Sequence, residues 1–367
     1  MTDLGSDRLD AVVDARPGDL LGLTAVLCAV PSVSGTEEPL ADAIEARLRL
    51  RAPTLTLDRI RHNVVARTDF GRSRRIVLGG HLDTVPANGN DQPRIEGDVV
   101  HGLGTADMKG GLAALLRLAE ETAGGGAYDC TFVFYEGEEV AEEHNGLRLL
   151  FEVAPDVLAG DFAVLLEPTA GWMEAGCQGT IHLRASFRGE RAHSARPWTG
   201  VNAIHRAAPV LARIAGHDAP VVEVDGLEYR ESLQVVRVEA GVANNVVPDE
   251  CVVVVNRRYA PAQSLDDALA ETGALLAEAD DLEVLNASPA APPNLSNPLV
   301  ADFVELLGLP VRPKLGWTDV ARFAARGVPA CNFGPGDPLL AHTAGEYVER
   351  SSLEQVHAAL ATFLGVI

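Results

Sequence analysis

The stretch from Arg75 to Gly111 constrains the fold of this chain more than any other. It begins with a short apolar run, Ile76–Leu78, that ends in paired glycines and is typical of a buried strand. His81 and Asp83 follow, and because residues i and i+2 of an extended chain point the same way, both should leave the strand on one side. Asp107 follows a glycine-rich turn, just before an apolar-periodic stretch that predicts a helix. Ligands collect beyond such strand ends in open α/β sheets, so one imidazole and two carboxylates there suggest a metal site.

Three strand-like segments alternate with helical ones in the first half of the chain, which predicts a parallel, doubly wound sheet. The expected strands are Ile76–Leu78, Cys130–Tyr135 and Phe162–Leu166, and the expected helices are Gly111–Ala123 and Gly146–Val153. Earlier in the chain we expect helices at Pro17–Val30 and Glu37–Leu50, two short strands at Leu55–Arg59 and Asn63–Arg67, and a polar loop at Ala87–Gly97. Ser34 or Thr36 is expected to cap the second helix.

From about Gly176 the pattern changes to long alternating strands, which predicts an α+β module with an antiparallel sheet. A segment rich in Pro, Ala and Ser, Ser288–Pro293, then marks a boundary, after which the helix and strand pattern of the first part returns. We therefore predict an α/β catalytic domain with a doubly wound, mainly parallel sheet, formed by residues 1–175 and 291–367. An α+β, ferredoxin-like domain of residues 176–290 is inserted into it.

The charge and the cysteines narrow the classes of partner and location. A formal net charge of −22 argues against nucleic acid or an anionic membrane as a partner. The five scattered cysteines include no Cys-x-x-Cys and fit reduced thiols better than a disulfide scaffold. The N-terminal stretch is acidic and polar, and no segment approaches the length of a membrane span. We expect a cytoplasmic protein.

Acidic or imidazole groups follow several expected strands. They are His81 and Asp83, Glu138 and Glu139, Glu167, and His342, with Asp107 at the start of a helix. Each alone has an ordinary explanation: the Glu138–Glu139 loop could be a solvated acidic turn, and His342 a surface histidine. Chance rarely places so many at one sheet edge. Two His and three carboxylates suit two divalent ions with a bridging carboxylate, Zn²⁺ being the first candidate. A carboxylate not used as a ligand could act as general base, and Asp83 is placed to orient the His81 ring.

These segments resemble the dinuclear-zinc amidohydrolases and exopeptidases of the M20 type. The matching motifs span almost the whole chain in the family's order: Gly-Gly-His81-Leu-Asp83-Thr-Val-Pro, Gly-Thr-Ala-Asp107-Met-Lys-Gly-Gly, Glu136-Gly-Glu138-Glu139, Leu-Glu167-Pro-Thr, Arg-Ala-His193-Ser-Ala and Gly-Pro-Gly-Asp-Pro-Leu-Leu-Ala-His342.

The resemblance implies a role for each matched residue. Asp107 would bridge two metal ions, with His81 and Glu167 on one ion and Glu139 and His342 on the other. Glu138 would be the general base and Asp83 the residue behind His81. The inserted domain would be a lid and dimerisation module, and His193 would cross the interface of a homodimer to stabilise the oxyanion in the partner's site. Zn²⁺ is expected in both sites, with Co²⁺ an alternative.

Within the family the chain is most similar to the actinobacterial desuccinylases, which act on N-succinyl-LL-2,6-diaminopimelate. The segments that carry this likeness are Gly176-Cys-Gln-Gly-Thr, Asp225-Gly-Leu-Glu-Tyr-Arg-Glu, Gly241-Val-Ala-Asn-Asn-Val-Val-Pro-Asp and Gly316-Trp-Thr-Asp-Val-Ala-Arg-Phe. Asn244 or Asn245, Arg258 and Thr318 would then contact the substrate. Cys177 and Gln178 stand where other desuccinylases carry Arg residues, so a succinyl carboxylate would need another cation, such as Arg258 or Arg322.

Three alternatives stay open from the sequence. The substrate could be that of an acetylornithine-type deacetylase or of a dipeptidase or carboxypeptidase of the same family. A non-catalytic relative that binds a metal or an amino acid is a further alternative. Cys177 could be a thiolate nucleophile, although a small buried residue at a strand start is the more ordinary interpretation.

Overall fold

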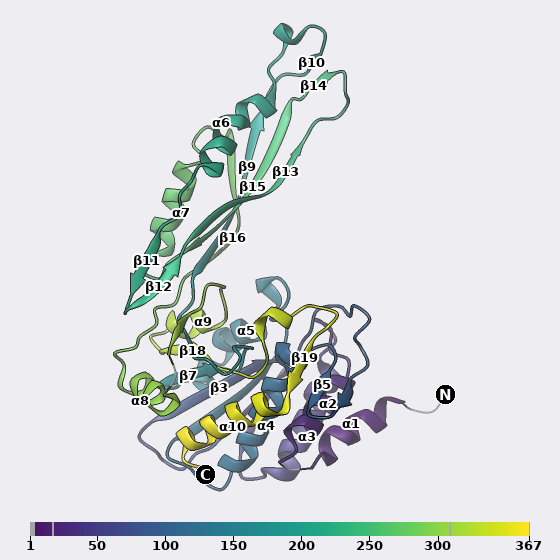
Figure 1. The fold of residues 1–367 in the computed structure, drawn as a ribbon, viewed down its shortest axis with the longest axis vertical. Helices are drawn as coiled ribbons and strands as arrows, with labels where there is room; N and C mark the ends of the chain where they lie inside the picture. Colours follow the sequence, from purple (N-terminus) through teal and green to yellow (C-terminus); the bar gives the residue numbers. More distant parts are fainter. Residues whose placement is uncertain (1–3, 17, 309, 367) are drawn as a thin grey trace. The chain divides into compact units, whose positions relative to one another are not determined.

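The structure is a computed structural model that describes residues 4–16, 18–308 and 310–366. The chain forms two compact units. Unit 1 consists of Met1–Ala175, Asn294–Arg312 and Arg322–Ile367, and unit 2 consists of Gly176–Pro293 and Pro313–Ala321 (Figure 1). These units differ from the predicted segments in two respects. Unit 2 extends to Pro293 rather than to residue 290, and Pro313–Ala321 packs with unit 2 rather than with the end of the chain.

A sheet of eight strands forms the centre of unit 1, in the order β1-β2-β6-β3-β7-β18-β8-β17. The strands are β1 (Thr56–Ile60), β2 (Asn63–Arg67), β3 (Arg75–His81), β6 (Asp129–Tyr135), β7 (Phe162–Leu165), β8 (Glu174–Ala175), β17 (Arg312–Pro313) and β18 (Ala330–Asn332). The middle of the sheet is parallel: β3 pairs with β6 and with β7, and β7 pairs with β18. The mainly parallel sheet expected from the sequence is therefore confirmed. Since β3, β6 and β7 run the same way, the residues that follow them emerge at one edge.

Helices surround the sheet of unit 1 and pack on it or on one another. They are α1 (Leu4–Asp14), α2 (Leu20–Ala29), α3 (Glu38–Arg51), α4 (Gly110–Thr122), α5 (Gly146–Val153), α8 (Pro298–Leu307), α9 (Val320–Ala324) and α10 (Arg350–Leu364), with short helical turns η1 (Thr105–Lys109), η2 (Glu142–His144), η3 (Pro155–Leu158) and η5 (Pro338–Leu340). Strand β3 is buried along its apolar part. Phe162 of β7 meets Phe303 of α8 and Phe363 of α10 edge to face, and these two rings are tilted against each other, so the three rings form part of the core. Among the described residues, no helix combines the length and the apolar character needed to cross a bilayer.

Two local predictions are wrong. The segment expected as a polar loop contains β4 (Arg94–Glu96), which forms a small antiparallel sheet with β5 (Val99–His101) and β19 (Tyr347–Glu349). Neither residue expected to cap α3 does so: Ser34 donates to Asp83, and Thr36 donates to the main-chain oxygen of Val33. The predicted start of the preceding helix, Pro17, lies outside the described residues.

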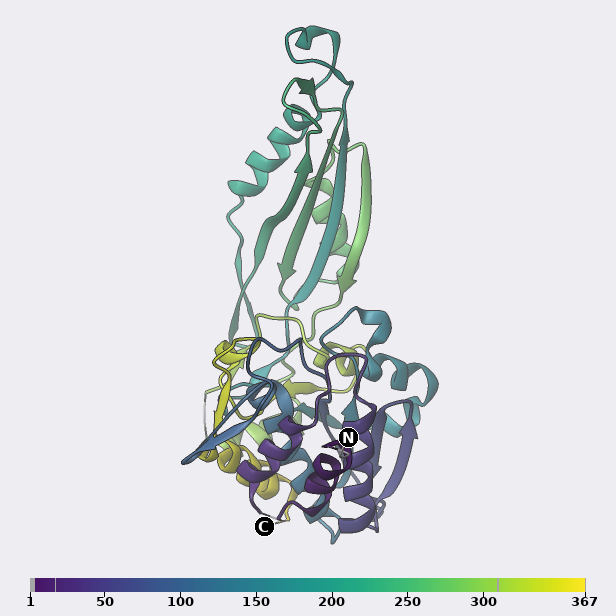
Figure 2. The same ribbon diagram turned by 90° about the vertical axis from the view of Figure 1, so that its right-hand side faces the viewer.

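Unit 2 is built on an antiparallel sheet, as the sequence predicts, and this sheet has four strands in the order β13-β15-β9-β16. Its elements are β9 (Gly179–Arg188), β10 (Ala192–His193), η4 (Pro197–Thr199), α6 (Ala203–Ala215), β11 (Val221–Val224), β12 (Leu227–Arg230), β13 (Ser232–Ala240), β14 (Val246–Val247), β15 (Glu250–Tyr259), α7 (Leu265–Ala274) and β16 (Asp281–Ser288). Helices α6 and α7 cover one face of the sheet (Figure 2). Burial therefore alternates along β9, whose side chains point in turn toward and away from these helices. Where the chain enters and leaves this unit, Cys177 and Ala291 pair side by side.

Candidate metal centre and active site

Strand β3 delivers His81 to the sheet edge, and the glycine before it, Gly80, lets helix α4 and the turn before it pack closely. A Cβ on Gly80 would lie 2.6 Å from Met108 Cε and 2.9 Å from Leu112 Cδ2. His81 itself is only 1% exposed. Its Nδ1 donates to the main-chain oxygen of Asp83 at 3.0 Å. Because a carbonyl oxygen can only accept, the proton is on Nδ1, and Nε2 is the nitrogen that can bind a metal ion.

The carboxylate of Asp83 fixes the loop that follows β6. It accepts hydrogen bonds from the main-chain nitrogens of Glu138 and Glu139, each at 3.0 Å. A third hydrogen bond comes from Ser34 Oγ at 2.7 Å. The sequence predicts that this carboxylate orients the His81 ring; in the structure the main-chain oxygen of Asp83 is nearer to the ring, and Oδ1 lies 3.5 Å from Nδ1. Asp83 thus connects the strand end that carries His81 with the loop that carries Glu138 and Glu139.

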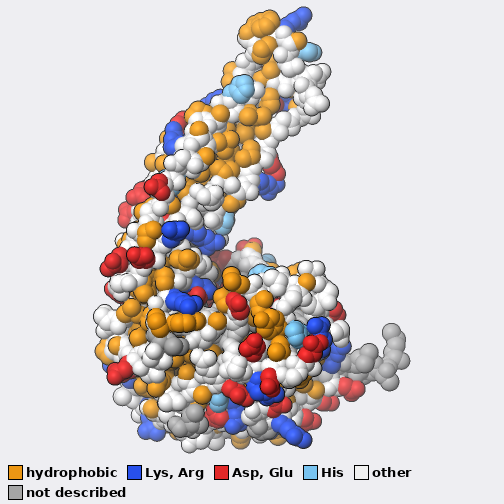
Figure 3. Space-filling view, viewed as in Figure 1, with side chains coloured by type: hydrophobic (Ala, Val, Ile, Leu, Met, Phe, Trp, Pro, Cys, Tyr) orange, Lys and Arg blue, Asp and Glu red, His pale blue; other side chains and the backbone are white. Residues whose placement is uncertain are grey.

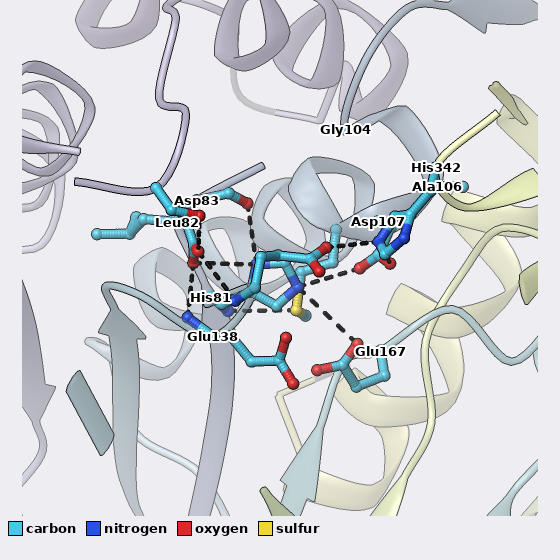
Figure 4. A network of polar contacts seen from close by, with 12 residues as sticks. His81, Leu82, Asp83, Gly104, Ala106, Asp107, Glu138, Glu167 and His342 are labelled. Carbon is cyan, nitrogen blue, oxygen red and sulfur yellow. Dashed lines mark hydrogen bonds and ion pairs between the residues drawn. The ribbon is translucent and has the colours of Figure 1, made fainter. Parts of the chain in front are cut away.

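Asp107 lies between two imidazoles (Figure 4). Its Oδ1 is 3.0 Å from His81 Nε2, and its Oδ2 is 3.4 Å from His342 Nε2. A carboxylate that bridges two metal ions must present one oxygen to each, and Asp107 has this arrangement.

The other candidate ligands complete the two sides of Asp107. Glu167, which follows β7, places Oε2 4.0 Å from His81 Nε2. Glu139 places Oε1 2.8 Å from His342 Nε2. His342 has a φ of 62°, a left-handed conformation that residues other than glycine adopt uncommonly and that often accompanies functional sites. All five candidate ligands therefore meet at one edge of the unit 1 sheet.

This donor set fits a pair of divalent ions. The ligand atoms of His81, Asp107 and Glu167 lie within 4.8 Å of one another, and so do those of Asp107, Glu139 and His342. Imidazole nitrogen and carboxylate oxygen are the donors that Zn²⁺ and similar ions accept. Glu138 is near enough to form a third group with His81 and Glu139, and its carboxylate extends toward His81 in Figure 4.

The pKa values of His81, His342 and Asp107 are shifted in the directions that favour positive charge in the site. Burial alone would lower the pKa of His81, but hydrogen bonds to Asp107 and Asp83 raise it well above its usual value. Hydrogen bonding to Asp107 also raises the pKa of His342, to about 9. Burial would raise the pKa of Asp107, yet its two imidazole partners hold it below the usual value. The carboxylates thus favour positive charge at the positions where metal ions would bind.

Most of the remaining candidate residues belong to unit 2, but Arg322 belongs to unit 1. His193 is exposed on β10, and its Nδ1 accepts a hydrogen bond from the main-chain nitrogen of Ala195. Since β10 pairs with β14 and Ser194 bonds to the main-chain oxygen of Asn245, His193 and the two asparagines lie at the same end of unit 2. Arg258 is on β15, where burial lowers the pKa of its guanidinium, and Thr318 is in the segment that packs beside Cys177.

Cys177 and Gln178 are structural in this fold. Cys177 is fully buried, and burial raises the pKa of its thiol to about 11, which disfavours the thiolate form at neutral pH. The Gln178 side chain donates to the main-chain oxygen of Arg230 at 2.8 Å.

Comparison with known proteins agrees with the geometry. Residues 77–365 match the sequence profile of peptidase family M20/M25/M40. The chain is 47% identical over 355 residues to a Mycobacterium tuberculosis protein with the provisional name succinyl-diaminopimelate desuccinylase DapE, an alignment that covers 96% of this chain and 100% of that one. It is 42% identical over 365 residues to the succinyl-diaminopimelate desuccinylase of Corynebacterium glutamicum, covering 96% and 99% of the two chains.

A solved structure with the same fold is that of the aminopeptidase PepT from Bacillus cereus. It superposes with a TM-score of 0.75 at 20% identity and covers 95% of this chain and 98% of its own. The sequence profile and the two relatives together cover nearly the whole chain. The chain belongs to peptidase family M20/M25/M40 and is a metal-dependent hydrolase that acts on amides.

Proposed function

We propose that this protein removes the succinyl group from N-succinyl-LL-2,6-diaminopimelate, giving succinate and LL-2,6-diaminopimelate for lysine and cell-wall synthesis. The observation that carries this proposal is the site at the edge of the unit 1 sheet, where Asp107 lies between the imidazoles of His81 and His342 and a second carboxylate, Glu138, lies near His81. The desuccinylase names of the two bacterial relatives support the choice of substrate.

The proposed ligands are divided between two ions that share Asp107. His81 and Glu167 would hold one ion, and Glu139 and His342 the other. Zn²⁺ is the proposed metal, and Co²⁺ is the alternative. Two such ions, when bound, polarise the scissile carbonyl and lower the pKa of a water molecule.

Glu138 is the proposed general base. Its carboxylate would accept a proton from the water as the water oxygen bonds to the carbonyl carbon of the amide. As the bond between carbon and nitrogen breaks, the same carboxyl group would return the proton to the leaving amine. The products are a carboxylic acid and a free amine, and Glu138 ends each cycle in its initial ionised state.

We also propose a homodimer in which the inserted domain is the interface and the lid. Hydrophobic side chains gather along unit 2 (Figure 3). They include the exposed Val236 and Val238 of β13 and Val284 of β16. An exposed apolar surface of this kind is typical of an association site. In such a dimer His193 would stabilise the developing oxyanion in the partner's site, and Asn244 or Asn245 would contact the substrate.

The carboxylate of a succinyl group needs a cation in the site, and Cys177 and Gln178 supply none. Arg258 and Arg322 are the proposed candidates, and Thr318 would contact the substrate through its hydroxyl or main chain. Arg322 is close to Glu142, with NH1 and Oε1 3.2 Å apart. A cytoplasmic location, predicted from the sequence, stays a prediction.

A substrate panel tests the proposal. Metal-loaded enzyme is expected to hydrolyse N-succinyl-LL-2,6-diaminopimelate with a far higher kcat/KM than N-acetylornithine, other N-acetylated amino acids or dipeptides. A preference for one of the latter would assign a deacetylase or peptidase activity instead. No hydrolysis of any of these amides by enzyme shown to contain metal would favour a non-catalytic relative.

A further inference from the structure

Glu346, which is outside the proposed ligand set, forms hydrogen bonds to several main-chain nitrogens of the loop that carries Asp107. This loop, residues 102–107, lies between β5 and α4. Most of its main-chain nitrogens form no hydrogen bond within a regular helix or strand. Glu346 Oε1 accepts from Ala106 N at 2.8 Å and from Asp107 N at 3.0 Å. Its Oε2 accepts from Gly104 N at 3.0 Å. One carboxylate therefore holds three main-chain groups of this loop, including that of Asp107 itself.

The same residue ties the loop to the turn that carries His342. The main-chain oxygen of Glu346 accepts from Gly102 N at 3.1 Å, and its own nitrogen donates to Thr343 O at 3.3 Å. Directly after Glu346, strand β19 begins and pairs with β5. Glu346 thus lies where the segments that present Asp107 and His342 are joined.

The Glu346 carboxylate is buried, and a buried charge destabilises the folded state unless it is fully hydrogen-bonded. Glu346 is only 2% exposed, and a buried carboxylate is destabilising without donors to satisfy it. The three N–H groups provide those donors, and the charge of the buried Lys109 attracts the carboxylate. An amide or an apolar side chain of similar size would fill the same volume without this cost, but it could not accept from all three N–H groups.

We propose that Glu346 is a positioning residue that orients Asp107, so that one oxygen of Asp107 faces His81 and the other faces His342 before metal binds. It acts through the loop and does not contact a metal ion or substrate. This inference rests on the ligand assignment of the proposed function and extends it to a residue behind the ligands.

The test is Glu346→Gln, studied in the full-length protein. The substitution keeps the shape of the side chain, but an amide NH₂ replaces one oxygen and would face N–H groups that it cannot accept from. Metal-free protein is titrated calorimetrically with Zn²⁺, and the visible absorption of the Co²⁺-loaded protein is recorded. We expect Zn²⁺ to bind about 10–100-fold more weakly than in the parent, the range seen when partners of metal ligands are removed. The Co²⁺ absorption bands should also shift, because the ligand geometry changes.

Asp129→Asn is the matched control. Asp129 is also a buried carboxylate that accepts from two main-chain nitrogens, those of Phe70 and Arg72, but it begins β6 and its loop carries no proposed ligand. We expect this variant to lose stability while keeping the parent's Zn²⁺ affinity and Co²⁺ spectrum. Equal weakening of metal binding in both variants would show a general effect of destabilisation and would overturn the inference.

A second variant tests the same connection without changing a buried charge. The Asn90 side chain donates to Thr343 O at 3.1 Å, in the same turn as His342. Asn90→Ala is expected to weaken Zn²⁺ binding in the same direction and by less. Parent-like affinity and spectra in a folded Glu346→Gln protein would refute the inference; if that protein does not fold, parent-like values for Asn90→Ala would refute it. Failure of the parent to bind two ions would instead refute the ligand assignment of the proposed function.

Discussion

Glu138 and Glu139 are neighbours in sequence, and the proposed function gives them different tasks. Glu139 contacts His342 at 2.8 Å and belongs to the candidate ligand set. Glu138 lies beside His81, while its main-chain nitrogen is fixed by Asp83. A carboxylate held in place next to the ligands without being needed as one is suited to proton transfer.

Glu138→Gln is therefore expected to reduce kcat by at least about 100-fold, the lower end of what a general base contributes, while about two metal equivalents per subunit remain bound. Steady-state kinetics and elemental analysis of the same preparation measure both quantities. Glu143→Gln, at an exposed position of the same loop, is the control and should retain parental values. Unchanged turnover in Glu138→Gln would remove Glu138 from the mechanism.

Asp129, at the start of strand β6, should make the free energy of unfolding depend on pH. Burial would raise its pKa, but hydrogen bonds from Phe70 N, Arg72 N and Thr68 Oγ1 hold it below the usual value of 3.8. A carboxyl group whose pKa is lower in the folded state stabilises the fold above its unfolded pKa, and this contribution is lost as the pH falls through the folded value.

Asp129→Asn should consequently reduce the free energy of unfolding by about 1–3 kcal/mol at neutral pH, where it leaves buried donors without an ionised acceptor. Below about pH 4 the difference from the parent should shrink, because the parent carboxylate becomes protonated. Urea unfolding at neutral and acid pH measures the difference. A difference that stays constant across this range would mean that ionised Asp129 does not stabilise the fold.

At the level of elements, close packing of helix α4 against the sheet depends on glycine. A Cβ on Gly111 would lie 2.4 Å from the main-chain oxygen of Leu166, which is the residue before Glu167. Main-chain atoms cannot move aside as a flexible side chain can, so either the helix or the strand end must shift.

We expect Gly111→Ala to destabilise the protein by about 1–3 kcal/mol and to weaken metal binding, because the shift displaces Glu167. Thermal unfolding and metal titration measure the two effects. Gly273→Ala in α7 is the control: its Cβ meets nothing within 4 Å, so it should be neutral or slightly stabilising as a helix substitution. A Gly111→Ala protein as stable as the parent would contradict the packing argument.

The elements with a strong local pattern could be predicted, and those that depend on distant partners could not. Strand β2 and helix α5 have the bounds that their sequence predicts. Helix α1 was missed by pattern because its sequence is polar and acidic. Arg47 of α3 holds the end of this helix, because its Nη1 donates to the main-chain oxygens of Val12 and Ala15. The Nε of the same side chain donates to Glu120 at 2.6 Å. Those contacts span separate helices, and no local pattern reveals them.

At the level of the whole molecule, the candidate ligands could be predicted because parallel strands end at one edge. His81 ends β3, and Glu139 and Glu167 follow β6 and β7; these three strands lie side by side in the sheet. The residues behind them could not be predicted in the same way. Ser34 donates its hydroxyl to Asp83, and Glu346 accepts from main-chain N–H groups of the Asp107 loop. Every residue except proline has such an N–H group, so the sequence of the Asp107 loop does not indicate that Glu346 binds there. A single serine likewise forms no recognisable motif with a distant aspartate.

The division of the candidate residues between the two units supplies the last prediction. All five proposed ligands and Glu138 belong to unit 1, whereas His193 belongs to unit 2. If a symmetric dimer supplies His193 to the partner's site, a subunit with Glu138→Gln still carries an intact His193 for its partner. A subunit with His193→Ala likewise keeps its own Glu138. Each variant alone should be nearly inactive, since both sites of its dimer are defective.

Mixing the two variants under conditions that exchange subunits should restore activity. Random exchange makes half of the dimers mixed, and each mixed dimer has one complete site, so recovery should approach about a quarter of the parent's activity. A mixture of Glu138→Gln with Glu139→Ala should recover none, because each of these substitutions disables the site of its own subunit. If mixed dimers are demonstrated by mass but no activity returns, His193 does not act across the interface; if no dimer forms at all, the site must be completed within one chain.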